Sequence, residues 1–146
     1  MTGRKTSNAH RRRGSELVEF ALVSFLLFSV IFAVFEFGRM VLVYNSIANA
    51  ACVGVRFAEV RGSQRTPPAT LGDICGVVTS FTSGLNTAAL TCGGSAGSRI
   101  AVSWPDGNTK PGSRVQVTVV YRYDPFFSVL PLKVNLGSTT EGYIMY

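Results

Sequence analysis

A long apolar run near the start of the chain limits what the rest of it can fold into. Between Leu17 and Phe37 the polar side chains are Glu19, Ser24, Ser29 and Glu36. A helix needs about 20 mostly apolar residues to cross ~30 Å of hydrocarbon. The run meets this requirement, and we therefore expect residues 15–37 to form a membrane-spanning helix.

The charges on either side of the run predict its orientation. Of the fourteen bases, five precede Gly14, and Arg39 is the only base in the twelve residues after Phe37. Positive charge collects on the cytoplasmic side, so residues 1–14 form a basic cytoplasmic leader and residues 38–146 lie outside the membrane. The leader is polar and has no apolar periodicity, and we expect it to be disordered. After Gly14 nine bases face eight acids. The basic excess therefore belongs to the leader, and we expect no nucleic-acid partner.

An acid lies just inside the apolar run. Burying Glu19 at membrane depth costs about 2.5–3.5 kcal/mol, and acids in such positions are usually functional. Glu19 follows Gly14 by five residues, and Gly14 follows the basic stretch Arg11–Arg13. This arrangement resembles the cleavage region of type IV pilin-like precursors, in which a basic leader ends in Gly and a Glu stands fifth in the mature chain.

Three stretches narrow the resemblance to the TadE-like proteins of tight-adherence (Flp-type) pilus assembly. They are residues 14–23 (GSELVEFALV), 35–39 (FEFGR) and 50–56 (AACVGVR). The resemblance implies a pilin-like fold and a minor pilin or pseudopilin that assists pilus assembly and adhesion. It also implies cleavage between Gly14 and Ser15 by a prepilin peptidase. The implied partners are that peptidase, other pilin or pseudopilin subunits, an inner-membrane assembly platform and membrane lipid. The implied location is the inner membrane, as a single-pass protein, or a surface pilus.

Cleavage would give Glu19 a positive counterpart. A new α-amino group on Ser15 is mostly cationic at neutral pH. Its pairing with Glu19, in a neighbouring subunit or in the same one, would offset the desolvation of both charges and fix the axial register of packed helices. We therefore predict Glu19, with the adjacent Phe20, as recognition and assembly residues.

Two other interpretations of the apolar run differ in whether the chain is cut. An ordinary signal peptide or lipoprotein signal fits poorly because the run is too long, has an acid in its first turn and is not closely followed by a small-x-small site. The main alternative is an uncleaved single-span anchor that presents an extracytoplasmic binding domain.

The remaining sequence predicts an α+β domain. The helix continues amphipathically to about Arg61, and residues 71–81 are spaced for a second helix. Alternating or β-rich stretches predict strands at 88–92, 99–104, 114–123 and once or twice in 132–146, with an apolar loop at 126–131. We expect one long helix packed on a small antiparallel sheet.

The polar chemistry of the chain does not predict a catalyst. His10 lies in the leader, so a processed chain lacks the histidine that most nucleophilic triads and zinc sites need. We expect no enzyme, no cofactor and no metal. For an exported domain with three cysteines we expect a Cys75–Cys92 disulfide, whose loop of about 18 residues is worth ~3 kcal/mol, although pairings with Cys52 remain open.

Overall fold

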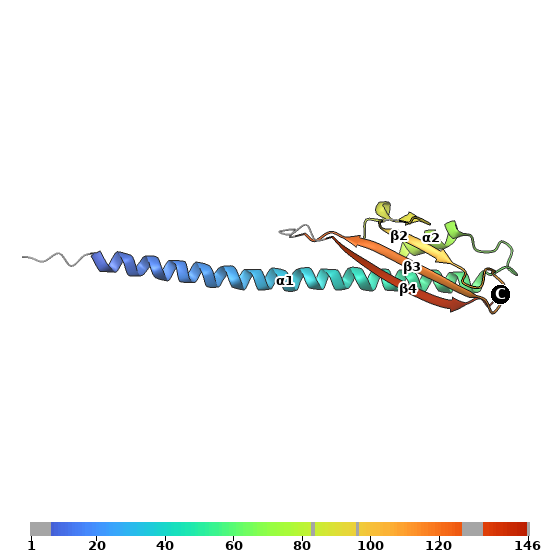
Figure 1. Cartoon of the computed structure of the whole chain (residues 1–146), viewed down its shortest axis with the longest axis horizontal. Helices are drawn as coiled ribbons and strands as arrows, with labels where there is room; N and C mark the ends of the chain where they lie inside the picture. Colours follow the sequence, from blue (N-terminus) through green and yellow to red (C-terminus); the bar gives the residue numbers. More distant parts are fainter. Residues whose placement is uncertain (1–6, 83, 96, 127–132, 146) are drawn as a thin grey trace, which may run out of the picture. The chain divides into compact units, whose positions relative to one another are not determined.

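The computed structural model describes residues 7–82, 84–95, 97–126 and 133–145, with the backbone alone for residues 7–13. The chain divides into two compact units, Met1–Gly38 and Arg39–Tyr146. Helix α1 (Ser7–Val60) belongs to both units. The second unit adds α2 (Leu71–Phe81), the 3₁₀ helix η1 (Thr87–Ala89) and strands β1 (Thr91–Cys92), β2 (Arg99–Ser103), β3 (Arg114–Tyr123) and β4 (Val134–Tyr143) (Figure 1).

The helix begins earlier than its sequence predicts. We expected residues 1–14 to be disordered, whereas α1 already starts at Ser7; residues 1–6 lie outside the described part. No proline separates Ser7 from the apolar run. Because each residue added to an existing helix gains a hydrogen bond without a new nucleation cost, helix extends back into the leader. At the other end α1 stops at Val60, one residue before the predicted Arg61.

The core of the second unit lies between its two helices and one face of the sheet. In Figure 1 β3 and β4 cross the C-terminal part of α1 obliquely. The buried apolar side chains come from both helices, from β2 and β3, and from the residues after β4. They are Ile47, Ala50, Ala51, Val55 and Ala58 of α1, Ile74, Cys75 and Val78 of α2, Ile100, Val115, Val117 and Val119 of the strands, and Ile144.

The sheet has the strand order β1-β2-β3-β4 and is mixed. Its β2–β3 and β3–β4 pairs are antiparallel, as expected of the small sheet, whereas the two-residue strand β1 runs parallel to β2. Alternation of apolar residues reports which side chains share a face, not the direction of the neighbouring strand. The predicted strand at 88–92 is also shorter, because Thr87–Ala89 forms the 3₁₀ helix η1.

The alternation predicted for residues 114–123 is confirmed. Val115, Val117 and Val119 are fully buried, while the residues between them are half-buried on the other face. The predicted region 132–146 supplies one strand, β4, rather than two. Residues 127–132, which include most of the predicted apolar loop, lie outside the described part.

Close packing of β4 against α1 depends on a missing side chain. A Cβ placed on Gly142 would overlap the Glu59 carboxylate and lie 2.6 Å from a methyl of Val55. Real Cβ atoms do not approach other atoms so closely, and overpacking of this kind usually costs 1–3 kcal/mol. Gly142 therefore lets the last strand lie directly on the helix.

Helix α2 begins where its sequence predicts and is held by a capping box and a disulfide. The Thr70 side chain accepts from the Asp73 backbone N–H, and the Thr70 N–H donates to the Asp73 carboxylate. The Thr70 hydroxyl also donates to this carboxylate, and these bonds lower the pKa of Asp73. The predicted Cys75–Cys92 disulfide is confirmed, with Cα atoms 6.0 Å apart, and it ties α2 to β1.

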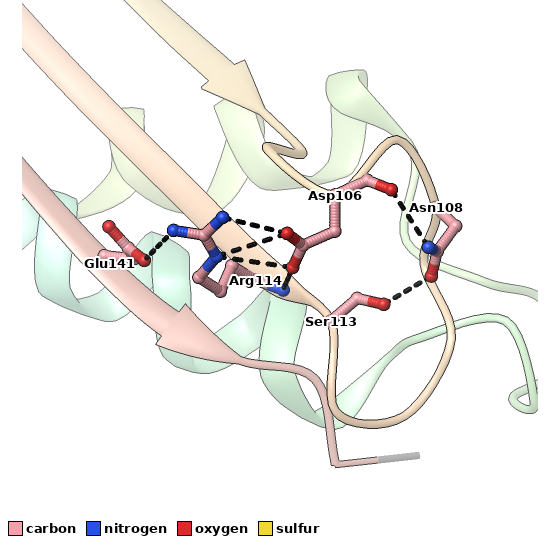
Figure 2. Close-up of polar contacts among 5 residues, drawn as sticks. All are labelled: Asp106, Asn108, Ser113, Arg114 and Glu141. Carbon is pink, nitrogen blue, oxygen red and sulfur yellow. Dashed lines mark hydrogen bonds and ion pairs between the residues drawn. The ribbon is translucent and has the colours of Figure 1, made fainter.

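A polar cluster closes the turn between β2 and β3 (Figure 2). The Arg114 guanidinium donates to Asp106 at 2.9 Å and forms a second ion pair with Glu141 of β4 at 3.6 Å. The Arg114 backbone N–H also donates to Asp106 at 2.8 Å. The Arg114 side chain and then its backbone N–H hold the pKa of Asp106 below its ordinary value. Because the side chain and the backbone of Arg114, the first residue of β3, both bind the Asp106 carboxylate, we infer that this cluster stabilises the turn.

Candidate membrane-spanning and processing segment

The apolar segment of α1 presents its side chains outward on every side. Leu17, Phe20 and Phe35 are 69%, 71% and 68% exposed. The helix over Gly14–Val60 contains an 18-residue window with a mean hydropathy of 2.6, and none of that window is buried inside the protein. A helix that is apolar all round needs either lipid or other apolar helices around it. By length and composition, then, α1 is able to cross a membrane.

Polar and aromatic groups within this segment are arranged in ways that suit an apolar environment. The Ser29 hydroxyl donates to the carbonyl of Phe25 at 2.8 Å, which satisfies the hydroxyl within the helix. Donation to the carbonyl four residues earlier is a common solution for serine in a helix. One turn apart, the rings of Phe28 and Phe32 lie 6.5 Å from centroid to centroid. The Ser29 hydroxyl therefore does not depend on water for a hydrogen-bond acceptor.

The predicted cleavage junction lies on an open stretch of helix. Gly14 and Ser15 are both exposed, and a Cβ placed on Gly14 would meet no atom within 4 Å. Glycine is about 0.8–1.0 kcal/mol less favourable than alanine inside a helix, so the helix is locally weak here. A peptidase would meet this bond in a part of the helix that is comparatively easy to unwind.

Ser15 and Glu19 share one face of the helix. They are four residues apart, the spacing that places side chains one above the other along a helix, and both are exposed. Glu16 follows Ser15 directly and points about 100° away from it around the helix axis. Phe20, next to Glu19, carries an exposed ring. Cleavage after Gly14 and the assembly roles of Glu19 and Phe20 stay predictions.

One contact in the second unit was not foreseen from the sequence. The guanidinium carbon of Arg39 lies 5.1 Å from the ring centroid of Tyr123, the last residue of β3. These residues are 84 positions apart, and no local pattern links them. Arg39 is the first residue of the second unit. The contact therefore places the C-terminal end of β3 beside the point where the chain enters this unit.

A protein-family model matches this part of the chain. Residues 14–56 match the family model of the TadE-like protein. The match begins at Gly14 and ends inside α1, so it covers the apolar segment and part of the helix that packs on the sheet. No curated protein and no solved structure matches the chain.

The TadE-like match confirms the resemblance predicted from residues 14–23, 35–39 and 50–56. It supports a part for this chain in tight-adherence (Tad/Flp) pilus assembly. Most of the second unit follows residue 56 and lies beyond the match. Within the described residues, no group of three or more His, Cys, Asp or Glu side chains gathers as a metal site would require.

Proposed function

We propose that this TadE-like chain is a minor pilin or pseudopilin precursor that a prepilin peptidase cuts between Gly14 and Ser15. The observation that carries the proposal is the family match over residues 14–56, which begins at the predicted cut and runs along an exposed apolar helix. The protein is then a substrate and a structural subunit rather than an enzyme. Its domain boundaries follow from the same proposal: leader 1–14, membrane span 15–37 and an extracytoplasmic domain in 38–146.

Retention in the membrane before assembly follows from the charge distribution. Arg4, Lys5 and Arg11–Arg13 hold the leader in the cytoplasm, and the span remains in the inner membrane after the leader is removed. The second unit lies outside, where a disulfide such as Cys75–Cys92 persists. Removal of the leader takes away five positive charges and leaves a short polar end that a neighbouring helix is able to approach.

The new N-terminus then provides the assembly contact. The Ser15 amine and the Glu19 carboxylate lie on one helix face, and an amine from a second subunit is able to reach the same carboxylate when helices pack side by side. Such a pair is stable in an apolar environment because each charge offsets the desolvation of the other. Phe20 supplies apolar surface beside the pair. In this way the subunit helps to assemble the pilus and, through it, to promote adhesion, working with other pilin-like subunits and the assembly platform.

Genetic complementation tests this proposal. Deletion of the gene should reduce piliation and adhesion, and wild-type protein expressed in trans should restore both. Glu19→Gln should reach the membrane at the wild-type level yet fail to restore piliation. Glu16→Gln is the matched control, since it removes the same charge from the same exposed turn but at the second position of the processed chain, not the fifth, and it should restore pili.

The competing anchor hypothesis gives the opposite result. An uncleaved single-span anchor needs neither a free Ser15 amine nor its acidic partner. Normal piliation in the Glu19→Gln strain, or in the deletion strain itself, would therefore reject the assembly role that we assign to this chain.

A further inference from the structure

The end of the sheet that lies beside Arg39 differs in charge from the rest of the second unit. Four of the nine bases in residues 39–146 lie at or near this end, but only one of the five acids does: Arg39, Arg99, Arg122 and Lys133, against Asp124. The register places Arg122 opposite Asn135 and Tyr123 opposite Val134, so Lys133 follows directly from the edge of the pairing. The Arg122 N–H donates to the Ser98 hydroxyl, which brings the start of β2 to the same end.

This basic end also exposes an aromatic side chain. Phe126 is 79% exposed, the highest value among the large apolar side chains of the described residues. It follows Tyr123 by three residues, a reach of at most about 11 Å. Because Arg39 stacks on Tyr123, Phe126 and the bases lie close to the first residue of the second unit. Bases flanking an exposed aromatic ring are typical of surfaces that bind at the membrane interface.

Chain connectivity brings this end to the bilayer. Arg39 follows Phe37, the last apolar residue of the predicted span, by two positions. However the two units are oriented, Arg39 lies within two residues of the end of the apolar run, and Tyr123 lies against it. The opposite end of the sheet, which carries Trp104 and Lys110, is about eight strand residues away, or roughly 25 Å.

We infer that the Arg39 end of the second unit, formed by Arg39, Arg122, Phe126 and Lys133, is a second membrane contact that binds the anionic surface of the bilayer holding its own helix. The exposed Arg122 and Lys133 would pair with phosphate headgroups, and the Phe126 ring would enter the interface between headgroups and acyl chains. The contact would hold the domain against the membrane until the subunit is extracted into a pilus. The inference rests on the membrane anchoring in the proposed function, but not on cleavage after Gly14.

Tryptophan fluorescence in proteoliposomes tests the contact. Trp104 is the only tryptophan of the chain, so the wild-type protein reports on the far end of the domain. A Trp104→Phe, Phe126→Trp double variant reports on the near end. The full-length oxidised chain is reconstituted with phosphatidylglycerol and brominated phosphatidylcholine, whose bromine atoms quench nearby tryptophan. We expect loss of most of the fluorescence at position 126 and almost no loss at Trp104.

Charge reversal tests whether the bases carry the contact. Arg122→Glu with Lys133→Glu, made in the double-variant background, should abolish the quenching at position 126. The matched control reverses Arg65 and Lys110, two exposed bases at the far end, and should leave it unchanged. Replacing phosphatidylglycerol with neutral lipid should have the same effect as the first pair of reversals.

Several results would overturn the inference. They are quenching at position 126 no stronger than at Trp104, quenching that is insensitive to the charge of the lipid, and equal effects of the two pairs of reversals. Carbonate extraction of the same vesicles distinguishes these three results from a failure of the membrane anchor. A chain that does not span the membrane would be released by carbonate. A chain that stays in the vesicles and is quenched at position 126 would support the contact whether or not cells cut the chain after Gly14.

Discussion

Substituting Gly14 by alanine separates recognition by a peptidase from a simple effect on the helix. Gly14 and Gly38 both lie in α1, both are exposed, and a Cβ on either would meet nothing within 4 Å. Alanine therefore fits at both positions and should stabilise the helix by about 0.8–1.0 kcal/mol at each. Since 1.4 kcal/mol corresponds to a factor of ten, local unwinding becomes about 4–5 times rarer.

The two variants should differ only in processing. If the cut falls after Gly14, Gly14→Ala makes the scissile bond harder to expose and also adds a methyl group that the peptidase must accommodate. We expect processing to slow by more than the roughly five-fold that unwinding explains, so that full-length precursor accumulates. Gly38→Ala stabilises the helix 24 residues away and should be processed at the wild-type rate.

Pulse labelling in cells that express a prepilin peptidase provides the assay. The precursor and the product without residues 1–14 separate by electrophoresis, and the rate of conversion is read for each variant. Conversion of Gly14→Ala at the wild-type rate would refute the assignment of the cleavage site. Equal slowing of both variants would refute the local reasoning, because it would trace the effect to the helix as a whole.

Three further predictions concern the second unit. Gly142→Ala should lower the melting temperature by at least about 4 °C, because the added Cβ would overlap Glu59 and Val55 and overpacking costs about 1–3 kcal/mol. Gly137→Ala is the control on the same strand: its Cβ would have its nearest contact at 3.6 Å, so the melting temperature should not fall. Equal melting temperatures for the two variants would contradict the close packing of Gly142. Replacing Cys75 and Cys92 together by alanine should cost about 2–4 kcal/mol in chemical unfolding, and an unchanged midpoint would show that the disulfide adds nothing. Asp106→Asn should lower the melting temperature at pH 7. Because the folded state holds the pKa of Asp106 below its ordinary 3.8, the stabilisation is present above that value and is lost as the pH falls through the folded pKa, so the wild type and the variant should converge in acid. A difference that does not shrink as the pH falls below 3.8 would contradict this sign.

Local signals carried most of what the sequence predicts correctly. The apolar run, the alternation from Val115 to Tyr121 and the helix over residues 71–81 each follow from spacing within one short stretch, and the structure contains all three. The Cys75–Cys92 pairing was also anticipated, and the structure leaves Cys52 as a free, half-buried cysteine.

Non-local geometry accounts for what the sequence did not predict. The parallel pairing of Thr91 and Cys92 with β2 depends on how the connecting turn folds back, which alternation does not report. The close approach of Gly142 to α1 and the stacking of Arg39 on Tyr123 join residues more than 80 positions apart. The helical leader differs for another reason: composition predicts disorder, whereas helix extends into it from the stable apolar segment.

The central claim is that the working form of this protein begins with a new amine placed four residues before Glu19. Intact-mass and N-terminal analysis of the chain isolated from native membranes tests it most directly. We predict a chain that begins at Ser15 and lacks the basic leader. A chain that retains Met1 or Thr2 in most molecules would contradict the account and favour the uncleaved anchor.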